Sequence, residues 1–382
     1  MPPLSLYIHI PWCVQKCPYC DFNSHAVQHN GVPEQAYIQA LLTDLEQDLP
    51  KIWGRKIISI FIGGGTPSLF SPETIDLLLT QLRARLSILP QAEITLEANV
   101  GTVDNAHIQG FKQAGINRLS LGVQSFDDHQ LKILGRIHNR EQALNAIQIT
   151  QQQFEKFNID LMFGLPQQNV EMAIQDLQTA LQFKPPHLSW YQLTLEPNTW
   201  FYQHPPKVPS DDETWDIQQA GQKLIAQHGY ENYEISAYAQ KSHQCKHNLN
   251  YWQFGDYLGI GAGAHGKISD AAQNTITRMS KQRHPQTYLE TAHTAQVIVQ
   301  QQQLNHDDIC LEFMLNALRL KQGFYIQDFE SYTHLPFTDI AKPIKHAVQQ
   351  NWLVQQDERI YPTDLGQQFL NDVLGLFMSD SA

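Results

Sequence analysis

Three cysteines near the start of the chain have a spacing that suits a metal cluster. Cys13, Cys17 and Cys20 follow one another as C-x3-C-x2-C in the segment YIHIPWCVQKCPYC, directly after a short apolar run. Three thiolates in one loop can bind three irons of a four-iron cluster and leave the fourth iron open for another ligand. A small molecule that binds the open iron can receive an electron. The spacing therefore favours a [4Fe-4S] cluster at these residues.

Two other interpretations of the cysteines remain open. A zinc site usually contains paired C-x2-C units, or cysteine with histidine at matching spacing, and no second unit follows here. A disulfide would pair two of the cysteines and leave the third over. Five cysteines in 382 residues, three of them clustered, are more typical of a reducing compartment and a cofactor than of a disulfide framework.

The composition narrows the classes of protein. A chain of 382 residues is long enough for a barrel of about 250 residues and a smaller module. The formal charge of −12 argues against a protein that coats nucleic acid, and we expect no nucleic-acid partner. The apolar runs are shorter than the roughly 20 residues of a membrane helix, and no targeting segment precedes the first strand. We therefore expect a cytoplasmic protein without an integral membrane segment.

The first two-thirds of the chain alternate strand-like runs with amphipathic helical stretches. The predicted strands are Leu4–Ile10, Ile57–Ile62, Glu93–Ala98, Arg118–Val123, Phe157–Met162 and His187–Leu193. A helix is predicted around Ser71–Leu86, with Ser71 as its cap and Pro72 in its first position. Six strand–helix units predict an α/β fold, a parallel sheet shaped as an open, partial TIM-type β/α barrel. Polar or glycine-containing motifs follow the strands, at the end where such barrels build their sites.

The pattern fades after Gly266, and we expect three parts: a core at 1–266, a linker at 267–304 that includes Gln300–Gln303, and a C-terminal domain at 305–382. The predicted elements of the C-terminal domain are helices at Asp307–Leu320 and Ile340–Gln350, and a hairpin of Leu353–Gln355 and Ile360–Tyr361 with its turn at Asp357-Glu358. This order resembles a small winged-helix module.

The motifs together resemble a known family. The segment YIHIPWCVQKCPYC, the GGGTP turn at 63–67 and FNIDLMFGLP at 157–166 are similar to the radical S-adenosylmethionine (SAM) enzymes related to oxygen-independent coproporphyrinogen III oxidase (HemN), and within these to the HemW haem chaperones. The resemblance covers essentially the whole chain. It implies a [4Fe-4S] cluster and SAM. In such enzymes one electron from the cluster breaks the sulfonium carbon–sulfur bond of SAM and produces a deoxyadenosyl radical.

The resemblance also implies roles for individual residues, although it assigns no catalytic residue. Cys13, Cys17 and Cys20 match the cluster ligands. The residues that match cofactor contacts are Tyr7, Tyr19, Gly64, Gly65, Thr66, Glu97, Gln124, Arg136 and Asp160, and Thr194 and His265 align with further contacts. Taken alone, the glycines could form only a tight turn, and Glu97 or Asp160 could be a helix cap or part of an ion pair. Their positions at strand ends favour the cofactor interpretation.

The segment Gly261–Gly266 matches a dinucleotide fingerprint literally. No helical pattern follows it, and it comes late in the chain, so we do not expect NAD to bind there.

Three departures separate the chain from the oxidase. Phe22 stands where the oxidase group carries a further cysteine, and only a short segment precedes Cys13. The segment HNLNYW at 247–252 matches the H-N-x-x-Y-W signature of the haem chaperones. His247 could be an axial ligand of haem iron, and Tyr251 and Trp252 could pack against the porphyrin.

The alternative for this segment is that the two aromatic rings are core packing and His247 is a hydrogen-bonded surface residue. Cys245 is a second soft ligand to consider. Lys241, Lys246 and Arg278 are candidate partners of the haem propionates.

We therefore expect a haem chaperone that binds haem, a [4Fe-4S] cluster and SAM, and passes haem to acceptor haemoproteins such as respiratory or haem-storage proteins. Whether it cleaves SAM stays open, and we do not expect coproporphyrinogen oxidase activity. The alternative is the radical SAM oxygen-independent coproporphyrinogen III oxidase, a decarboxylating dehydrogenase. An RNA-modifying radical enzyme is disfavoured by the acidic charge and by the lack of a basic module.

Overall fold

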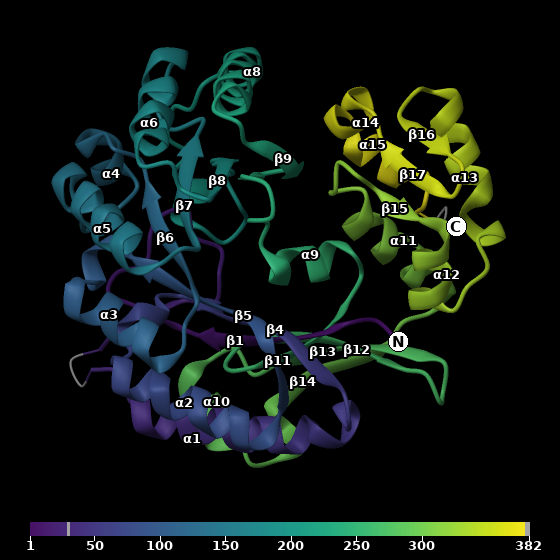
Figure 1. Ribbon diagram of the computed structural model, residues 1–382, viewed down its shortest axis with the longest axis horizontal. Helices are drawn as coiled ribbons and strands as arrows, with labels where there is room; N and C mark the ends of the chain where they lie inside the picture. The colour runs from purple at the N-terminus through teal and green to yellow at the C-terminus, as the bar shows by residue number, and fades with distance from the viewer. Residues whose placement is uncertain (29–30, 379–382) are drawn as a thin grey trace.

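The structure, a computed structural model, describes residues 1–28 and 31–378, and its central feature is a twelve-stranded sheet (Figure 1). The strand order is β14-β13-β12-β11-β1-β4-β5-β6-β7-β8-β10-β9. Six strands that follow one another in both sequence and space are parallel: β1 (Leu4–Ile10), β4 (Lys56–Gly64), β5 (Ser87–Asn99), β6 (Arg118–Gln124), β7 (Phe157–Phe163) and β8 (His187–Gln192). These are the six predicted strands.

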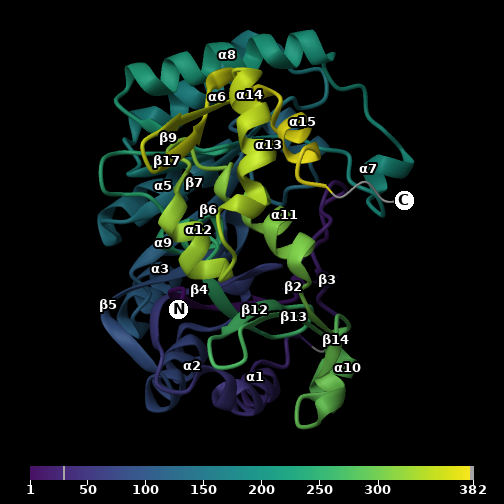
Figure 2. The same ribbon diagram turned by 90° about the vertical axis from the view of Figure 1, so that its right-hand side faces the viewer.

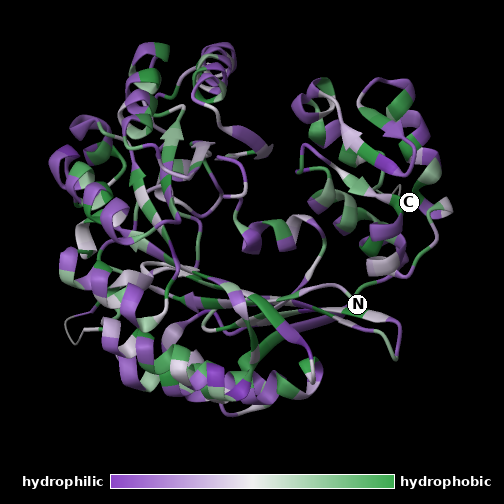
Figure 3. Cartoon of the chain, in the orientation of Figure 1, coloured by the Kyte–Doolittle hydropathy of each residue, from purple (hydrophilic) through white to green (hydrophobic). Residues whose placement is uncertain are grey.

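Helices lie between these strands along the chain, and the last two of them follow β8. They are α1 (Glu34–Asp48), α2 (Pro72–Arg85), α3 (Asn105–Ala114), α4 (Asp128–Ile133), α5 (Arg140–Gln153), α6 (Val170–Gln182), α7 (Trp200–Gln203) and α8 (Asp211–Gln227). The start of α2 is as predicted, because the Ser71 side chain accepts a hydrogen bond from the Thr74 amide and Pro72 occupies the first turn. In Figure 3 the helices alternate hydrophobic and hydrophilic segments, as helices with one buried face do.

The sheet remains open. At one edge β9 (Glu231–Glu234) and β10 (Ala237–Ala239) are antiparallel additions. At the other edge β11 (Asp256–Ile260) runs parallel to β1, and β12 (His265–Asp270), β13 (Thr275–Lys281) and β14 (Ile298–Gln303) continue antiparallel. No strand pairing between β9 and β14 closes the sheet in the described ranges. The predicted α/β open barrel is confirmed.

The predicted linker at 267–304 is wrong. This segment contains most of β12, together with β13, α10 (Pro285–Thr291) and β14, and it widens the sheet. Gln300–Gln303 pairs with Thr277–Ser280 of β13, and its side chains are exposed at the sheet edge. The segment is rich in glutamine because its side chains face solvent. It is nevertheless a strand because its backbone pairs with β13.

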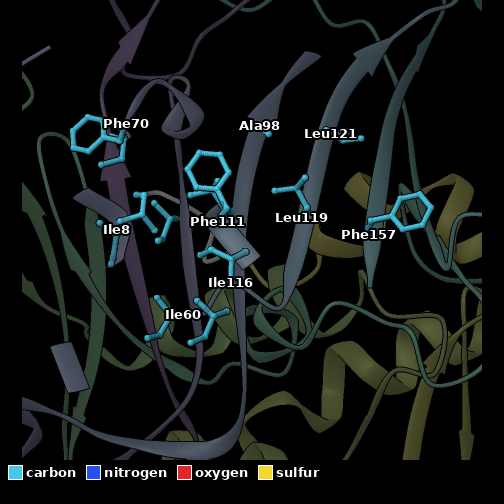
Figure 4. Close-up of a cluster of buried hydrophobic side chains, with 14 of the residues drawn as sticks. Ile8, Ile60, Phe70, Ala98, Phe111, Ile116, Leu119, Leu121 and Phe157 are labelled. Atoms are coloured by element: carbon cyan, nitrogen blue, oxygen red, sulfur yellow. The ribbon is translucent and has the colours of Figure 1, made fainter. Parts of the chain in front are cut away.

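The core lies between the sheet and the helices that cover it. Figure 4 shows strand residues such as Ile60 and Leu119 beside helix residues such as Phe111, and all three are fully buried. Removing this apolar surface from water is the main favourable contribution to folding.

The C-terminal module has its own core. It consists of α11 (His306–Ala317), β15 (Phe324–Tyr325), α12 (Ile326–Thr333), α13 (Thr338–Gln349), β16 (Leu353–Gln356), β17 (Arg359–Pro362), α14 (Asp364–Gln368) and α15 (Leu370–Gly375). The predicted hairpin is present as β16 and β17. Phe313 packs edge-on against Phe324 and Phe329, and also against Phe254 of the main domain.

The short helix α9 (Lys246–Trp252) lies between the main sheet and this module (Figures 1 and 2). Within the described parts of the chain, no helix combines the length and the apolar character that a membrane crossing requires.

Candidate functional site

The cysteine loop is held at both ends. β2 (Trp12–Cys13) pairs with β3 (His25–Ala26), and the His25 amide donates to the Pro11 carbonyl oxygen at 2.7 Å. All five cysteines are free thiols, which contradicts the disulfide alternative. In the described ranges, no three His, Cys, Asp or Glu side chains are grouped so as to hold a single metal ion. Cys13 is buried within β2, Cys17 and Cys20 are partly exposed in the loop, and all three line one cavity.

The GGGTP turn at the end of β4 packs against the base of this loop. The Gly65 and Thr66 amides donate to the carbonyl oxygens of Ile10 and Trp12, each at 2.7 Å. Gly64 has a φ of +117°, and a Cβ built there would lie 2.6 Å from Cε1 of His9. Both the left-handed backbone and the close approach require glycine at this position.

A cavity of about 380 Å³ opens where the parallel strands end. The predicted site residues that line it are Cys13, Cys17, Tyr19, Cys20, Gly64, Gly65, Thr66, Glu97, Gln124, Arg136 and Asp160. Tyr7, Thr194, His247 and His265 do not line it. The structure thus brings eleven of these fifteen predicted residues into one cavity, because consecutive parallel strands end at the same edge of the sheet.

Two carboxyl groups lie at the bottom of the cavity. Burial and the charge of Asp160 raise the pKa of Glu97 to about 8, although the Gly64 amide donates a hydrogen bond to Oε2 of Glu97 at 3.0 Å. Burial also raises the pKa of Asp160, and hydrogen bonds from Asn158 at 2.7 Å and Ser120 at 3.1 Å oppose this rise. Near neutral pH, Glu97 therefore tends to hold a proton until a positively charged group binds nearby.

Arg136 spans the other side of the cavity. Its Nη2 donates to Asn99 and, at 2.8 Å, to the Gly122 carbonyl oxygen, and its Nη1 lies 3.6 Å from Sγ of Cys17. Its buried Nε has no hydrogen-bond partner among the described residues. A buried donor without a partner is costly, so the group fits an acceptor that a bound ligand supplies. The thiols, the carboxyls and this donor together suit a cluster and SAM.

Sequence reasoning missed several cavity residues. Asn99 donates to Oγ1 of Thr66 at 2.7 Å, and the Tyr191 hydroxyl donates to Oε1 of Gln124 at 2.8 Å. Ser120 and Ser189 also line the cavity. The alternation of side chains along a predicted strand could have identified two of these residues. Ser189 and Tyr191 are two positions apart, so they share one face of β8.

A second cavity of about 460 Å³ is lined in part by Tyr7 and His9. The Tyr7 hydroxyl donates to Nδ1 of His9 at 2.9 Å, and Nε2 of His9 donates to the Asn23 carbonyl oxygen at 2.8 Å. The aromatic lining of this cavity includes Phe22, Tyr251, Trp252, Phe254 and Tyr257, and its cationic lining consists of Lys267, Arg278 and Arg283. Phe22 lines both cavities.

The structure places only some of the predicted haem residues in the second cavity. Tyr251 and Trp252 line the second cavity, but His247 does not. Its imidazole is buried, with Nδ1 hydrogen-bonded to Ser59 and Nε2 to Tyr251, both at 3.1 Å, and burial lowers its pKa to about 3. His247 is therefore hydrogen-bonded, as the alternative expects, but the surface position of that alternative is wrong because only 1% of the residue is exposed.

The other predicted haem partners lie in different surroundings. Cys245 is buried, which raises its pKa to about 12, and Lys241 and Lys246 are exposed outside the cavity. Arg278 lines the cavity, as does His265, which was aligned with cofactor contacts. Burial, with Arg278 and Arg283 nearby, lowers the pKa of His265. Thr194 is exposed and lines neither cavity.

Fold and site together define a class of protein. Residues 7–180 match the model of the radical SAM superfamily, and residues 304–369 match the HemN C-terminal domain. Among solved structures, coproporphyrinogen III oxidase (HemN) from Escherichia coli has the same fold. That comparison has a TM-score of 0.83 at 22% sequence identity, and covers 98% of this chain and 90% of the oxidase. The chain thus combines a radical SAM domain with a HemN-type C-terminal domain.

Curated relatives narrow this class. The Heme chaperone HemW of Haemophilus influenzae is 49% identical over 385 residues, which cover 100% of this chain and 99% of the relative. The Heme chaperone HemW of Escherichia coli is 47% identical over 381 residues, with the same coverage. The chain belongs to the heme chaperone HemW family.

Proposed function

We propose that this protein is a haem chaperone that holds a [4Fe-4S] cluster and SAM, binds haem and transfers it to acceptor haemoproteins. The observation that carries the proposal is the pair of neighbouring cavities, one lined by three thiols and one by aromatic and cationic side chains. They occur in a chain that is similar from end to end to proteins described as heme chaperones.

The first cavity would hold the resident cofactors. Cys13, Cys17 and Cys20 would bind three irons of the cluster. SAM bound beside the cluster would be the source of a deoxyadenosyl radical, formed when one electron breaks its carbon–sulfur bond. Glu97 would accept from a positively charged group of SAM, since its carboxyl already lies beside the glycine turn. Arg136 would donate from its unpartnered Nε to an anionic group.

The second cavity would hold the cargo. Haem combines a large aromatic plane with two carboxylates, and this cavity has aromatic walls and three cations. Asn316 of α11 also lines it, so the C-terminal module lies at the edge of the cargo site. An acceptor haemoprotein that docks on this module would therefore approach the haem directly.

The test is a transfer experiment with the full chain under anaerobic conditions. We expect reconstitution with iron and sulfide to give about four irons per chain and the visible absorption of a cluster. Added haem should then give a Soret band, and this band should move to an apo-cytochrome b separated afterwards by size.

A colourless or zinc-only product would contradict the cluster, and a missing Soret band would contradict the chaperone role. Coproporphyrinogen, SAM and a reductant are added in a parallel sample. Multiple turnovers to protoporphyrinogen there would support the oxidase alternative instead.

A further inference from the structure

The histidine of the HNLNYW segment is sealed in the folded protein. Only 1% of His247 is exposed, and Ser59 and Tyr251 occupy its two ring nitrogens. Its ring also packs 5.1 Å from the ring of Phe61. Iron coordination by this imidazole would require at least one of these hydrogen bonds to break and α9 to shift. A different side chain must therefore be considered as the ligand of the cargo.

Two other histidines line the aromatic cavity, and only one of them is available. His9 uses both ring nitrogens, one with the Tyr7 hydroxyl and one with the Asn23 carbonyl oxygen. His265, at the start of β12, is exposed to the cavity, and its ring forms no hydrogen bond with any residue in the described ranges. An imidazole with an unused nitrogen is a common axial ligand of haem iron.

The cationic side chains of the cavity also differ in whether they already have a partner. Lys267 is paired with Asp256 at 2.9 Å, and Arg278 is paired with Glu312. Arg283 is exposed and forms no ion pair with a residue that the structure describes. A propionate that meets Arg283 would gain a charge partner without displacing an existing one.

The cysteine loop holds both residues in place. Nδ2 of Asn23, three positions after Cys20, donates to the carbonyl oxygens of Ala262 at 2.9 Å and Arg283 at 2.8 Å. Gly263 has a φ of +80°, and a Cβ there would lie 2.4 Å from Nδ2 of Asn23. The backbone on which His265 and Arg283 lie is thus fixed by the loop that carries the cluster ligands.

We propose that haem binds in the cavity of about 460 Å³ with His265 as the axial ligand of its iron and Arg283 as the partner of a propionate. The assignment rests on the proposed function and names its cargo site. The volume lies within the range of roughly 300–1,000 Å³ typical of small-molecule sites. Tyr251 and Trp252 contribute the aromatic wall, so the HNLNYW segment shapes the site while its histidine holds α9 against β4 through Ser59.

Axial ligation is tested by titrating ferric protoporphyrin IX into the reconstituted full chain. The variants are His265→Ala, His247→Ala and, as a control, His293→Ala, an exposed histidine outside the cavity. We expect His265→Ala to weaken binding roughly tenfold or more and to lose the iron–imidazole band of the ferrous form in resonance Raman spectra. The other two variants should keep the band, and thermal unfolding confirms that each variant is folded.

The outcomes separate the site from the function. A His265→Ala variant that keeps the band and the wild-type affinity overturns the assignment, most directly if His247→Ala loses both. A wild-type protein that binds no haem overturns the proposed function as well.

The propionate contact has an independent readout in the dimethyl ester of the same porphyrin. The wild type should bind the ester roughly tenfold more weakly than the free acid, and Arg283→Ala should bind both equally. Arg83→Ala, on α2 and outside both cavities, is the matched control and should behave as the wild type does. An Arg283→Ala variant that still prefers the free acid tenfold excludes this partner.

Discussion

The buried carboxyl of Glu97 should make the ligand-free protein less stable as the pH rises. Its pKa is about 8 in the folded protein, whereas the ordinary value is 4.5. Between these values the folded protein binds a proton at Glu97 that the unfolded chain has lost. This difference lowers the free energy of unfolding by about 1.4 kcal/mol for each pH unit. The contribution of protonated Glu97 to the free energy of unfolding is therefore greatest in acid and is lost as the pH approaches 8.

Glu97→Gln removes the titration and keeps the shape, and the amide oxygen can still accept from Gly64. Between pH 4.5 and pH 8 the resulting change in the free energy of unfolding reaches about 5 kcal/mol as an upper limit. Relative to the wild type, the variant should gain stability steadily between about pH 5 and pH 8. Only the difference between the two proteins is used, so groups that titrate equally in both cancel.

Urea unfolding of both ligand-free proteins, followed by circular dichroism across this pH range, measures the difference. A difference that stays constant with pH would refute the assigned protonation state of Glu97. A second readout uses SAM: binding of its positive charge should release a proton from the wild type near neutral pH but not from Glu97→Gln. Calorimetry in buffers of different ionisation enthalpy detects that proton, and equal release from both proteins would also contradict the reasoning.

Three further substitutions test separate parts of the structure. Cys20→Ala should lose the iron and visible absorption of the reconstituted cluster, because two thiolates remain in the loop; metal analysis measures this. Arg136→Gln should weaken SAM binding roughly tenfold in equilibrium dialysis, because the charged donors are lost. Asp256→Asn should destabilise the protein by about 3–5 kcal/mol in urea unfolding, because the buried Lys267 and the partly exposed Arg55, at 2.9 and 2.7 Å, lose their carboxylate.

Each has a matched control or a contradicting result. Cys310→Ala, in the C-terminal module, should keep the full iron content, and equal iron loss in both cysteine variants would contradict a specific ligand role. Unchanged SAM affinity in Arg136→Gln would remove that residue from the cofactor site. A stability loss below about 1 kcal/mol in Asp256→Asn would show that the ion pairs of Asp256 contribute no more to stability than exposed pairs do.

Much of the main domain could be predicted from local patterns. The six parallel strands, the Ser71 cap and the glycine turn depend on residues within a few positions of each other, and all are present. Parallel pairing then places the strand ends together, which is why most predicted cofactor residues share one cavity. The segment 267–304 failed because a polar edge strand such as Gln300–Gln303 depends on a neighbouring strand, and composition carries no record of that neighbour.

The sequence by itself determined the spacing of the three cysteines, which confines their thiols to one segment of eight residues. It also determined the order of strands that forms the cofactor cavity. Only the tertiary structure decided which histidine faces the aromatic cavity. Ser59 and Tyr251 seal His247, while Asn23 holds the backbone beside His265 open to the cavity, and these contacts join residues up to 260 positions apart. Burial and hydrogen-bond occupancy of a side chain arise only when such distant segments pack.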